Sequence, residues 1–234
     1  MNVVFAKTCA NCECVVHSYE DLCNKCYSKI NFLTKHYCNT CGVLIPGDII
    51  TCGLCTTKQP PFITLKSVFG YDENSKNMII NLKFFDNLIY VKTYAKWMYN
   101  ANQDMFQNAD LIVPIPLHKL RLFKRKFNQS ALLAQAISKL SKLPCDLFKI
   151  KRVCNTKPQS GLSLKQRQEN LKKAFRVLNE KAFMNKSIVL IDDVITTGAT
   201  IRSCAQEIMN SGAKEVRVLS LARTINELPN SFVV

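Results

Sequence analysis

Short apolar runs that end in charged or turn-forming residues mark the strands expected in this chain. Residues 187–191 are apolar or small, with charge before them and turn chemistry after them, and residues 111–115 form a similar run ended by Pro114 and Pro116. Such runs are typical of parallel strands buried on both faces. Further strands are expected at residues 63–71, as a strand pair or an edge strand, and near residues 147–152.

Helices are expected between these strands. Tyr90, Tyr94 and Trp97 form an aromatic stripe at helical spacing, which favours a core position over stacking on nucleic-acid bases. A late helix should stop at Gly212, because glycine readily takes the left-handed conformation that ends helices. The expected helices cover residues 74–85, 88–100, 129–141 and 199–211.

The length of 234 residues leaves room for one α/β domain and one small module. Hydrophobic residues make up 47% of the chain and charged residues 21%, which are values of a globular protein with a sizeable core. Gln59-Pro60-Pro61 is the clearest linker, since consecutive prolines exclude helix and stiffen the chain. We therefore predict a small module over residues 1–58 and an α/β domain over residues 62–234.

Four Cys-x-x-Cys pairs lie in the first 58 residues, and the last two pairs repeat the first two after 29 positions. Without an export signal or a long apolar run, the chain is expected to keep its thiols reduced and available to a metal. Two Cys-x-x-Cys turns complete the tetrahedral four-thiolate set that zinc prefers. Two structural zinc ions are predicted, bound by Cys9, Cys12, Cys23 and Cys26 and by Cys38, Cys41, Cys52 and Cys55.

Spacing alone leaves alternatives open for these zinc sites. Cys14 can replace Cys12, His36 lies close enough to Cys38 to compete, and ligands from the two repeats can interleave. Redox-active pairs are a further alternative, against which four pairs in register argue. The module carries five Lys against four acidic residues, and each zinc with four thiolates adds about two negative charges. It is therefore expected to be a scaffold or partner surface rather than the main phosphate-binding surface.

The net charge of +15 is concentrated in one segment. Residues 112–176 hold 16 Lys or Arg but only two acidic residues, Asp146 and Glu169. Part of this charge lies in a loop after Pro116, on the edge where open α/β sheets bind ligands, and the loop over residues 157–167 is expected to close over a polyanion. The residues expected to bind pyrophosphate are Leu117, His118, Lys119, Arg121, Arg125, Lys126, Lys165 and Arg167, and those expected to bind DNA are Lys119, Arg121, Lys124, Arg125, Lys126, Lys157 and Lys165.

The sequence VLIDDVITTGAT at residues 189–200 combines two chemistries after an expected strand. Backbone amides and hydroxyls around Thr197 and Gly198 lie where a helix begins, and helix N-termini favour anions such as phosphate. Asp192 and Asp193 repel phosphate, so hydroxyl groups one sugar-width away suit them better, and a ribose 5-phosphate meets both conditions. The alternative is a strand–turn–helix in which the aspartates only cap the helix. The expected ribose 5-phosphate site consists of Asp192, Asp193, Val194, Ile195, Thr196, Thr197, Gly198, Ala199 and Thr200.

This string resembles the phosphoribosyl pyrophosphate signature of type I phosphoribosyltransferases at essentially every position. With the cysteine repeat, Val-Pro-Ile-Pro at 113–116 and Phe-Asn-Gln at 127–129, the chain is similar to the ComF family of competence proteins over almost its whole length. Further matches are Gln159, Arg167, Asn170 and Phe175. The resemblance implies a type I phosphoribosyltransferase-like parallel sheet with flanking helices, a double zinc-ribbon-like module, and a site for phosphoribosyl pyrophosphate with Mg2+. The chain departs from the family at Lys126, where glycine is common.

Three functions follow from the resemblance and the charge. The first is a competence factor in natural transformation, which binds incoming single-stranded DNA at the cytoplasmic side of the inner membrane and carries the ribose-phosphate site. The second is an active phosphoribosyltransferase with an unidentified acceptor, for which the sequence offers no general base. The third is a ligand sensor that recruits DNA-uptake or DNA-processing proteins through its zinc module. The chain is expected in the cytoplasm, with peripheral membrane association only through a partner or anionic lipid.

Overall fold

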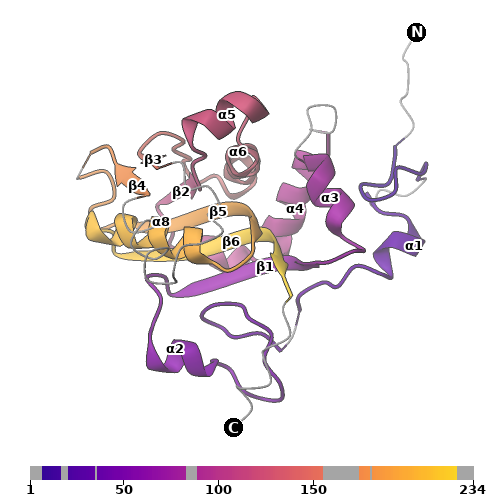
Figure 1. Cartoon of the computed structure of the whole chain (residues 1–234), viewed down its shortest axis with the longest axis horizontal. Helices are drawn as coiled ribbons and strands as arrows, with labels where there is room; N and C mark the ends of the chain where they lie inside the picture. Colours follow the sequence, from indigo (N-terminus) through magenta and orange to yellow (C-terminus); the bar gives the residue numbers. More distant parts are fainter. Residues whose placement is uncertain are drawn as a thin grey trace, which may run out of the picture.

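The computed structural model describes residues 7–16, 21–34, 36–82, 89–154, 174–179 and 181–225. Its centre is a four-stranded parallel sheet built from β1 (Thr64–Tyr71), β2 (Leu111–Pro114), β5 (Ser187–Ile195) and β6 (Glu215–Thr224) (Figure 1). The strands lie in the order β1-β6-β5-β2, so the first and last strands in sequence are neighbours. Because every pair is parallel, the carboxyl ends of the strands meet at one edge of the sheet, called the C-terminal edge below.

The two central apolar runs form strands as predicted. All four residues of β2 are buried, and so are the first six of β5, because helices cover both faces of the sheet. The run at residues 187–191 continues as a strand to Ile195, since Asp192, Val194 and Ile195 keep pairing with β6. The expectation that this strand ends at residue 191 was therefore wrong, and both aspartates lie inside it. Strand β1 is the edge strand that the sequence predicts.

Helices α3 (Lys76–Leu82), α4 (Val91–Ala101) and α6 (Gln129–Ser141) pack on one face of the sheet, and α8 (Ala199–Asn210) packs on the other. The predicted bounds of α6 are confirmed, and those of α8 differ by one residue, with Gly212 at φ 85° after its end. The aromatic stripe of α4 faces the core, as expected. Tyr94 is fully buried, and its ring centroid lies 5.5 Å from that of Trp97.

Two segments differ from the sequence expectation. Residues 119–125 form a helix, α5 (Lys119–Arg125), where a loop was expected. The strand expected near residues 147–152 is short, β3 (Ile150–Arg152), and it pairs with β4 (Phe175–Val177) in a separate antiparallel sheet. A 3-10 helix, η2 (Gln103–Phe106), precedes β2. Within the described ranges, no helix is long and apolar enough to cross a membrane.

The two cysteine repeats join different hydrophobic cores, and in Figure 1 α1 lies beside α3 whereas α2 lies apart from it, beyond β1. The first repeat (residues 9–26), with α1 (Asn24–Tyr27), shares a core with α3, α4 and α6. The second repeat (residues 38–55), with α2 (Gly53–Thr57), shares the core that contains α8. The segment between the two repeats pairs with β1: Phe32 forms an isolated antiparallel β-bridge with Phe69, and the N–H of Leu33 donates to the carbonyl of Val68. This segment therefore covers the free edge of β1. The domain boundary near residue 60 stays a prediction.

Candidate functional site

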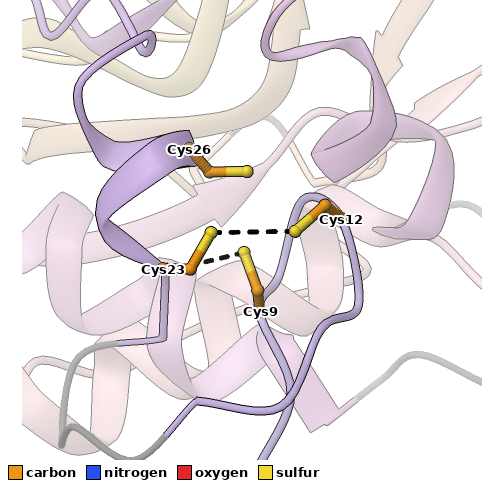
Figure 2. Close-up of side chains that lie close together, drawn as sticks. All are labelled: Cys9, Cys12, Cys23 and Cys26. Atoms are coloured by element: carbon orange, nitrogen blue, oxygen red, sulfur yellow. Dashed lines mark hydrogen bonds between the residues drawn. The ribbon is translucent and has the colours of Figure 1, made fainter.

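Each cysteine repeat brings four sulfur atoms together. The first cluster, shown in Figure 2, consists of Cys9, Cys12, Cys23 and Cys26, and the second consists of Cys38, Cys41, Cys52 and Cys55. In each cluster the four Sγ atoms lie within 4.8 Å of one another. The sequential pairing predicted from the spacing is confirmed, and interleaving of the two repeats is excluded.

The backbone holds both clusters in the same way. In the first, the N–H of Cys23 donates to Sγ of Cys9 at 3.3 Å, and in the second the N–H of Cys52 donates to Sγ of Cys38 at the same distance. Amide donors of this kind favour thiolates, which are the form that binds zinc. Burial would raise the pKa of Cys38, but amide hydrogen bonds lower it to about 7. The donor set therefore fits two structural zinc ions.

The alternative ligands lie beside the clusters rather than in them. Sγ of Cys14 is 3.4 Å from Sγ of Cys12, yet Cys14 is not one of the four sulfurs that lie mutually close. The hydrogen bond to Cys12 raises the pKa of the Cys14 thiol to about 12, which disfavours its thiolate. Nδ1 of His36 lies 3.4 Å from the carbonyl oxygen of Gly47, and His36 is absent from the second cluster.

The two aspartates of the expected ribose site have different environments. Asp192 is only 8% exposed, and its Oδ1 accepts hydrogen bonds from Oγ of Ser130 at 3.0 Å and from the N–H of Asp193 at 2.9 Å. Burial raises the pKa of Asp192 well above its usual range, and the adjacent charge of Asp193 adds to this rise. Asp193 is half-buried. It is therefore the carboxyl that a ligand at the C-terminal edge can reach.

A turn rich in threonine follows β5 and leads into α8. Thr196 and Thr197 are exposed, and Gly198, at φ 72°, is the N-terminal cap of the helix. A side chain at position 198 would be strained at this φ and would meet Nη1 of Arg202 at 3.1 Å. Arg202 donates in turn to the carbonyl of Thr197 at 3.3 Å. The turn thus presents hydroxyls and the amide end of a helix at the C-terminal edge, which suits a phosphate.

Helix α5 lies at the same edge, because it follows the end of β2. The N–H of Ile115 donates to Ile191 of β5, and Nδ2 of Asn128, the cap of α6, donates to the carbonyl of Ile115. Nδ1 of His118 accepts from the N–H of Leu120 and caps α5. No residue of α5 is buried, so its charges face solvent or the site. The cations here are Lys119, Arg121, Lys124, Arg125 and Lys126, and Leu117 is half-buried beside them. The predicted residues Lys157, Lys165 and Arg167 lie outside the described residues.

A curated relative matches the chain over nearly all of its length. "Competence protein F" of Haemophilus influenzae is 32% identical over 222 residues, which cover 92% of this chain and 96% of that protein. The chain belongs to the competence protein F family. "DNA utilization protein YhgH" of Escherichia coli is also 32% identical, over 87% of this chain and 91% of that protein.

Two family models match the two parts of the chain. The model "Double zinc ribbon domain" matches residues 1–56, and the model "Phosphoribosyl transferase domain" matches residues 83–230. Among solved structures, the purine phosphoribosyltransferase of Pyrococcus horikoshii aligns with a TM-score of 0.38 and 16% identity, over 61% of this chain and 80% of that chain. The two family models and the observed sheet together give the fold: a phosphoribosyltransferase-type parallel sheet with flanking helices, preceded by two four-cysteine zinc-binding clusters.

Sequence reasoning missed two polar residues of the candidate site. Ser130, at the start of α6, anchors Asp192, as described above. Arg152 of β3 forms an isolated parallel β-bridge, through its backbone, with His118. Burial and then the charge of Arg121 lower the pKa of Arg152, while the charge of Asp192 opposes this. Arg152 therefore lies near both the basic helix and the acidic pair, next to His118.

Proposed function

We propose that this chain is a competence factor that binds phosphoribosyl pyrophosphate with Mg2+ at the C-terminal edge and single-stranded DNA on the adjoining surface of α5. The observation that carries the proposal is the meeting of three features at this edge: the half-buried carboxyl of Asp193, the threonine turn before α8, and the cations of α5. One relative is a competence protein and another a DNA utilization protein, which supports a role with DNA. The proposal includes a cytoplasmic location, where thiols stay reduced.

The charge of each group decides which part of the ligand it is proposed to bind. The carboxylate of Asp193 would accept hydrogen bonds from ribose hydroxyls, while the hydroxyls of Thr196 and Thr197 and the amide end of α8 would bind the 5-phosphate. Mg2+ would offset part of the diphosphate charge. Lys119 and Arg121 would bind the pyrophosphate or, when DNA is bound, its backbone phosphates. Recruitment of DNA-uptake or DNA-processing proteins by the zinc module is a further part of the proposal.

Calorimetric titration of the zinc-loaded protein with phosphoribosyl pyrophosphate and Mg2+ tests the ligand site. We expect Asp193→Asn to weaken binding about tenfold or more, because a hydrogen bond to a charged group contributes about 1.5–3 kcal/mol. The control is Asp104→Asn, since Asp104 pairs with Lys66 near the amino ends of the strands. Absence of binding to the unsubstituted protein, or equal loss in both variants, would contradict the proposal. Acceptor-dependent release of pyrophosphate would extend it from binding to transfer.

Fluorescence anisotropy of a labelled oligodeoxythymidylate tests the DNA surface. With about five phosphate contacts at about 0.7 each, log affinity should fall against log salt with a slope near −3.5. The double substitution Lys119→Gln and Lys124→Gln on α5 should make the slope shallower by about 1.4. A matched double substitution, Lys139→Gln and Lys142→Gln at the far end of α6, keeps the net charge equal and should leave the slope unchanged. Affinity without salt dependence would remove the DNA part of the proposal.

A further inference from the structure

The second zinc cluster touches the strand that ends beside the ligand site. Arg223 lies near the end of β6, and its Nη1 donates to the carbonyl of the cluster cysteine Cys41. The residue after this cysteine, Gly42, leaves the room for the contact: a Cβ there would lie 2.7 Å from the carbonyl oxygen of Leu65 and 3.0 Å from Nη1 of Arg223. The guanidinium is thus held against the backbone of the cluster.

Zinc binding would fix the carbonyl that accepts this hydrogen bond, because Cys41 is one of the four cysteines of the second cluster. A zinc ion with four thiolates also carries about two negative charges, which attract a guanidinium held beside the cluster. Without zinc, no ion ties Cys41 to Cys52 and Cys55, so the carbonyl that holds Arg223 is less firmly placed.

On its other side, Arg223 lies next to the turn that would bind phosphate. It is the β6 partner of Ile195, the last residue of β5 before the turn at Thr196. Arg202 of α8 holds the turn itself, by donating to the carbonyl of Thr197. One hydrogen bond and one strand pairing therefore connect the second cluster through Arg223 to Ile195, after which the threonine turn begins.

We propose that Arg223 is a positioning residue that couples zinc at the second cluster to the shape of the threonine turn, so that zinc and the anionic ligand strengthen each other's binding. The ligand part of this inference rests on the function proposed above. Thermodynamic linkage makes this effect reciprocal. If zinc raises the affinity for phosphoribosyl pyrophosphate by a given factor, phosphoribosyl pyrophosphate must raise the affinity of the second cluster for zinc by the same factor.

The variant Arg223→Gln tests the coupling, and Arg217→Gln is its matched control. Arg217 lies on the same strand and also donates from Nη1 to backbone carbonyls, those of Met105 at 3.2 Å and Gln107 at 2.6 Å, but at the opposite edge of the sheet. Both variants lose one positive charge and one arginine anchor. Arg223→Lys keeps the charge and should restore part of each effect.

Three measurements on the full-length, zinc-loaded chain separate the outcomes. In Arg223→Gln we expect a competing chromophoric chelator to take one of the two zinc ions about tenfold more readily. Amide hydrogen exchange at residues 196–200 should become about tenfold faster. The affinity for phosphoribosyl pyrophosphate with Mg2+ should fall about fivefold to tenfold, which is within the usual range of coupling between two sites. Arg217→Gln should change none of the three.

The results distinguish failure of the coupling from failure of the proposed function. If Arg223→Gln weakens zinc binding but leaves exchange at residues 196–200 and ligand affinity unchanged, Arg223 supports only its zinc cluster and the inference is overturned. If the unsubstituted protein does not bind phosphoribosyl pyrophosphate, the proposed function is wrong, and hydrogen exchange alone decides the coupling. Quickened exchange in Arg223→Gln but not in Arg217→Gln then supports it, and unchanged exchange overturns it.

Discussion

The two zinc-binding clusters have almost the same backbone but different surroundings. The N–H of Cys9 donates to the carbonyl of Cys14 at 2.8 Å, and 29 residues later the N–H of Cys38 donates to that of Val43 at the same distance. The Sγ–Sγ distance between the second and third cysteines is 3.7 Å in both clusters. All four cysteines of the second cluster are buried, whereas the first contains the exposed Cys12 and the half-buried Cys23.

Two equivalent residues show what this difference means. Glu13 and Gly42 occupy the same place in the two repeats, and both have positive φ, 63° and 67°. A glutamate is tolerated in the first repeat because position 13 is exposed, so backbone torsion alone does not require glycine. In the second repeat, glycine is needed because Leu65 and Arg223 approach the position where a Cβ would be. The duplicated cysteine pattern is enough to form a zinc cluster in both repeats. Packing against the sheet then requires glycine at position 42 in the second repeat only.

Cysteine substitutions should give the largest contrast between the clusters. We expect Cys41→Ser to lose one zinc and to lower the melting temperature by about 10–20 °C, as a loss of about 5 kcal/mol would do in a domain of this size. Cys12→Ser should keep both zinc ions, because Cys14 lies 3.4 Å away and can take its place. Zinc content by elemental mass spectrometry and thermal unfolding by circular dichroism measure both effects.

The double substitution of Cys12 and Cys14 by serine is the control for this rescue, and it should release one zinc. In the unsubstituted protein, a chelator should remove zinc from the more exposed first cluster before the second. Equal melting temperatures and equal zinc loss in Cys41→Ser and Cys12→Ser would contradict the conclusion that the surroundings of the two clusters make them differ.

Replacing the equivalent residues at 13 and 42 should give the next largest effect. Gly42→Ala combines strain at positive φ with overpacking against Leu65, so we expect a loss of about 2–4 kcal/mol in the free energy of unfolding. Glu13→Gly relieves backbone strain at the cost of chain entropy and should stabilise by about 0.5 kcal/mol. Urea denaturation measures both. A loss of much less than 2 kcal/mol in Gly42→Ala would show that the second repeat accommodates a side chain as easily as the first.

Single hydrogen bonds that tie each repeat to the domain should have smaller effects. Tyr90→Phe removes a hydroxyl 2.6 Å from Oγ1 of Thr8, the residue before the first repeat, at a part-buried contact, and should cost about 1 kcal/mol. Thr64→Val removes a bond at 2.8 Å to the carbonyl of Asn39 in the second repeat, where water can replace the exposed donor, and should cost about 0.5 kcal/mol. The same urea titrations apply, and a reversed order would contradict this reading of the two contacts.

The smallest expected effect extends the rule about positive φ beyond the repeats. Lys126 caps α5 at φ 64°, the left-handed conformation that glycine takes at least cost. Because the residue is exposed, Lys126→Gly should stabilise the protein by about 0.5 kcal/mol, the same gain that is expected of Glu13→Gly. Lys124→Gly, within the helix, is the control and should destabilise it by about 1 kcal/mol. Destabilisation by Lys126→Gly in urea would show that its side-chain contacts outweigh the strain.

Local pattern was enough for the parts of the molecule that local chemistry decides. The spacing of cysteines predicted both zinc clusters, and apolar runs predicted the two central strands, because buried strands need continuous apolar residues. Helix α5 was missed because none of its residues is buried, so its sequence carries no amphipathic signal. The end of β5 was placed too early because the acidic pair interrupts the apolar run, whereas the pairing with β6 continues past it to Ile195.

By itself, the sequence determined that paired cysteines form two zinc sites, the α/β class and the position of the acidic pair and threonine turn along the chain, whereas the structure excluded Cys14, His36 and interleaved pairing. Only the tertiary structure decided which aspartate is accessible, since Ser130 reaches Asp192 from 62 residues away. It also decided that the second zinc cluster meets the end of β6, through a contact between Cys41 and Arg223 that spans 182 residues. The physical reason is the strand order β1-β6-β5-β2, which makes distant segments neighbours through pairing and burial that no local pattern encodes.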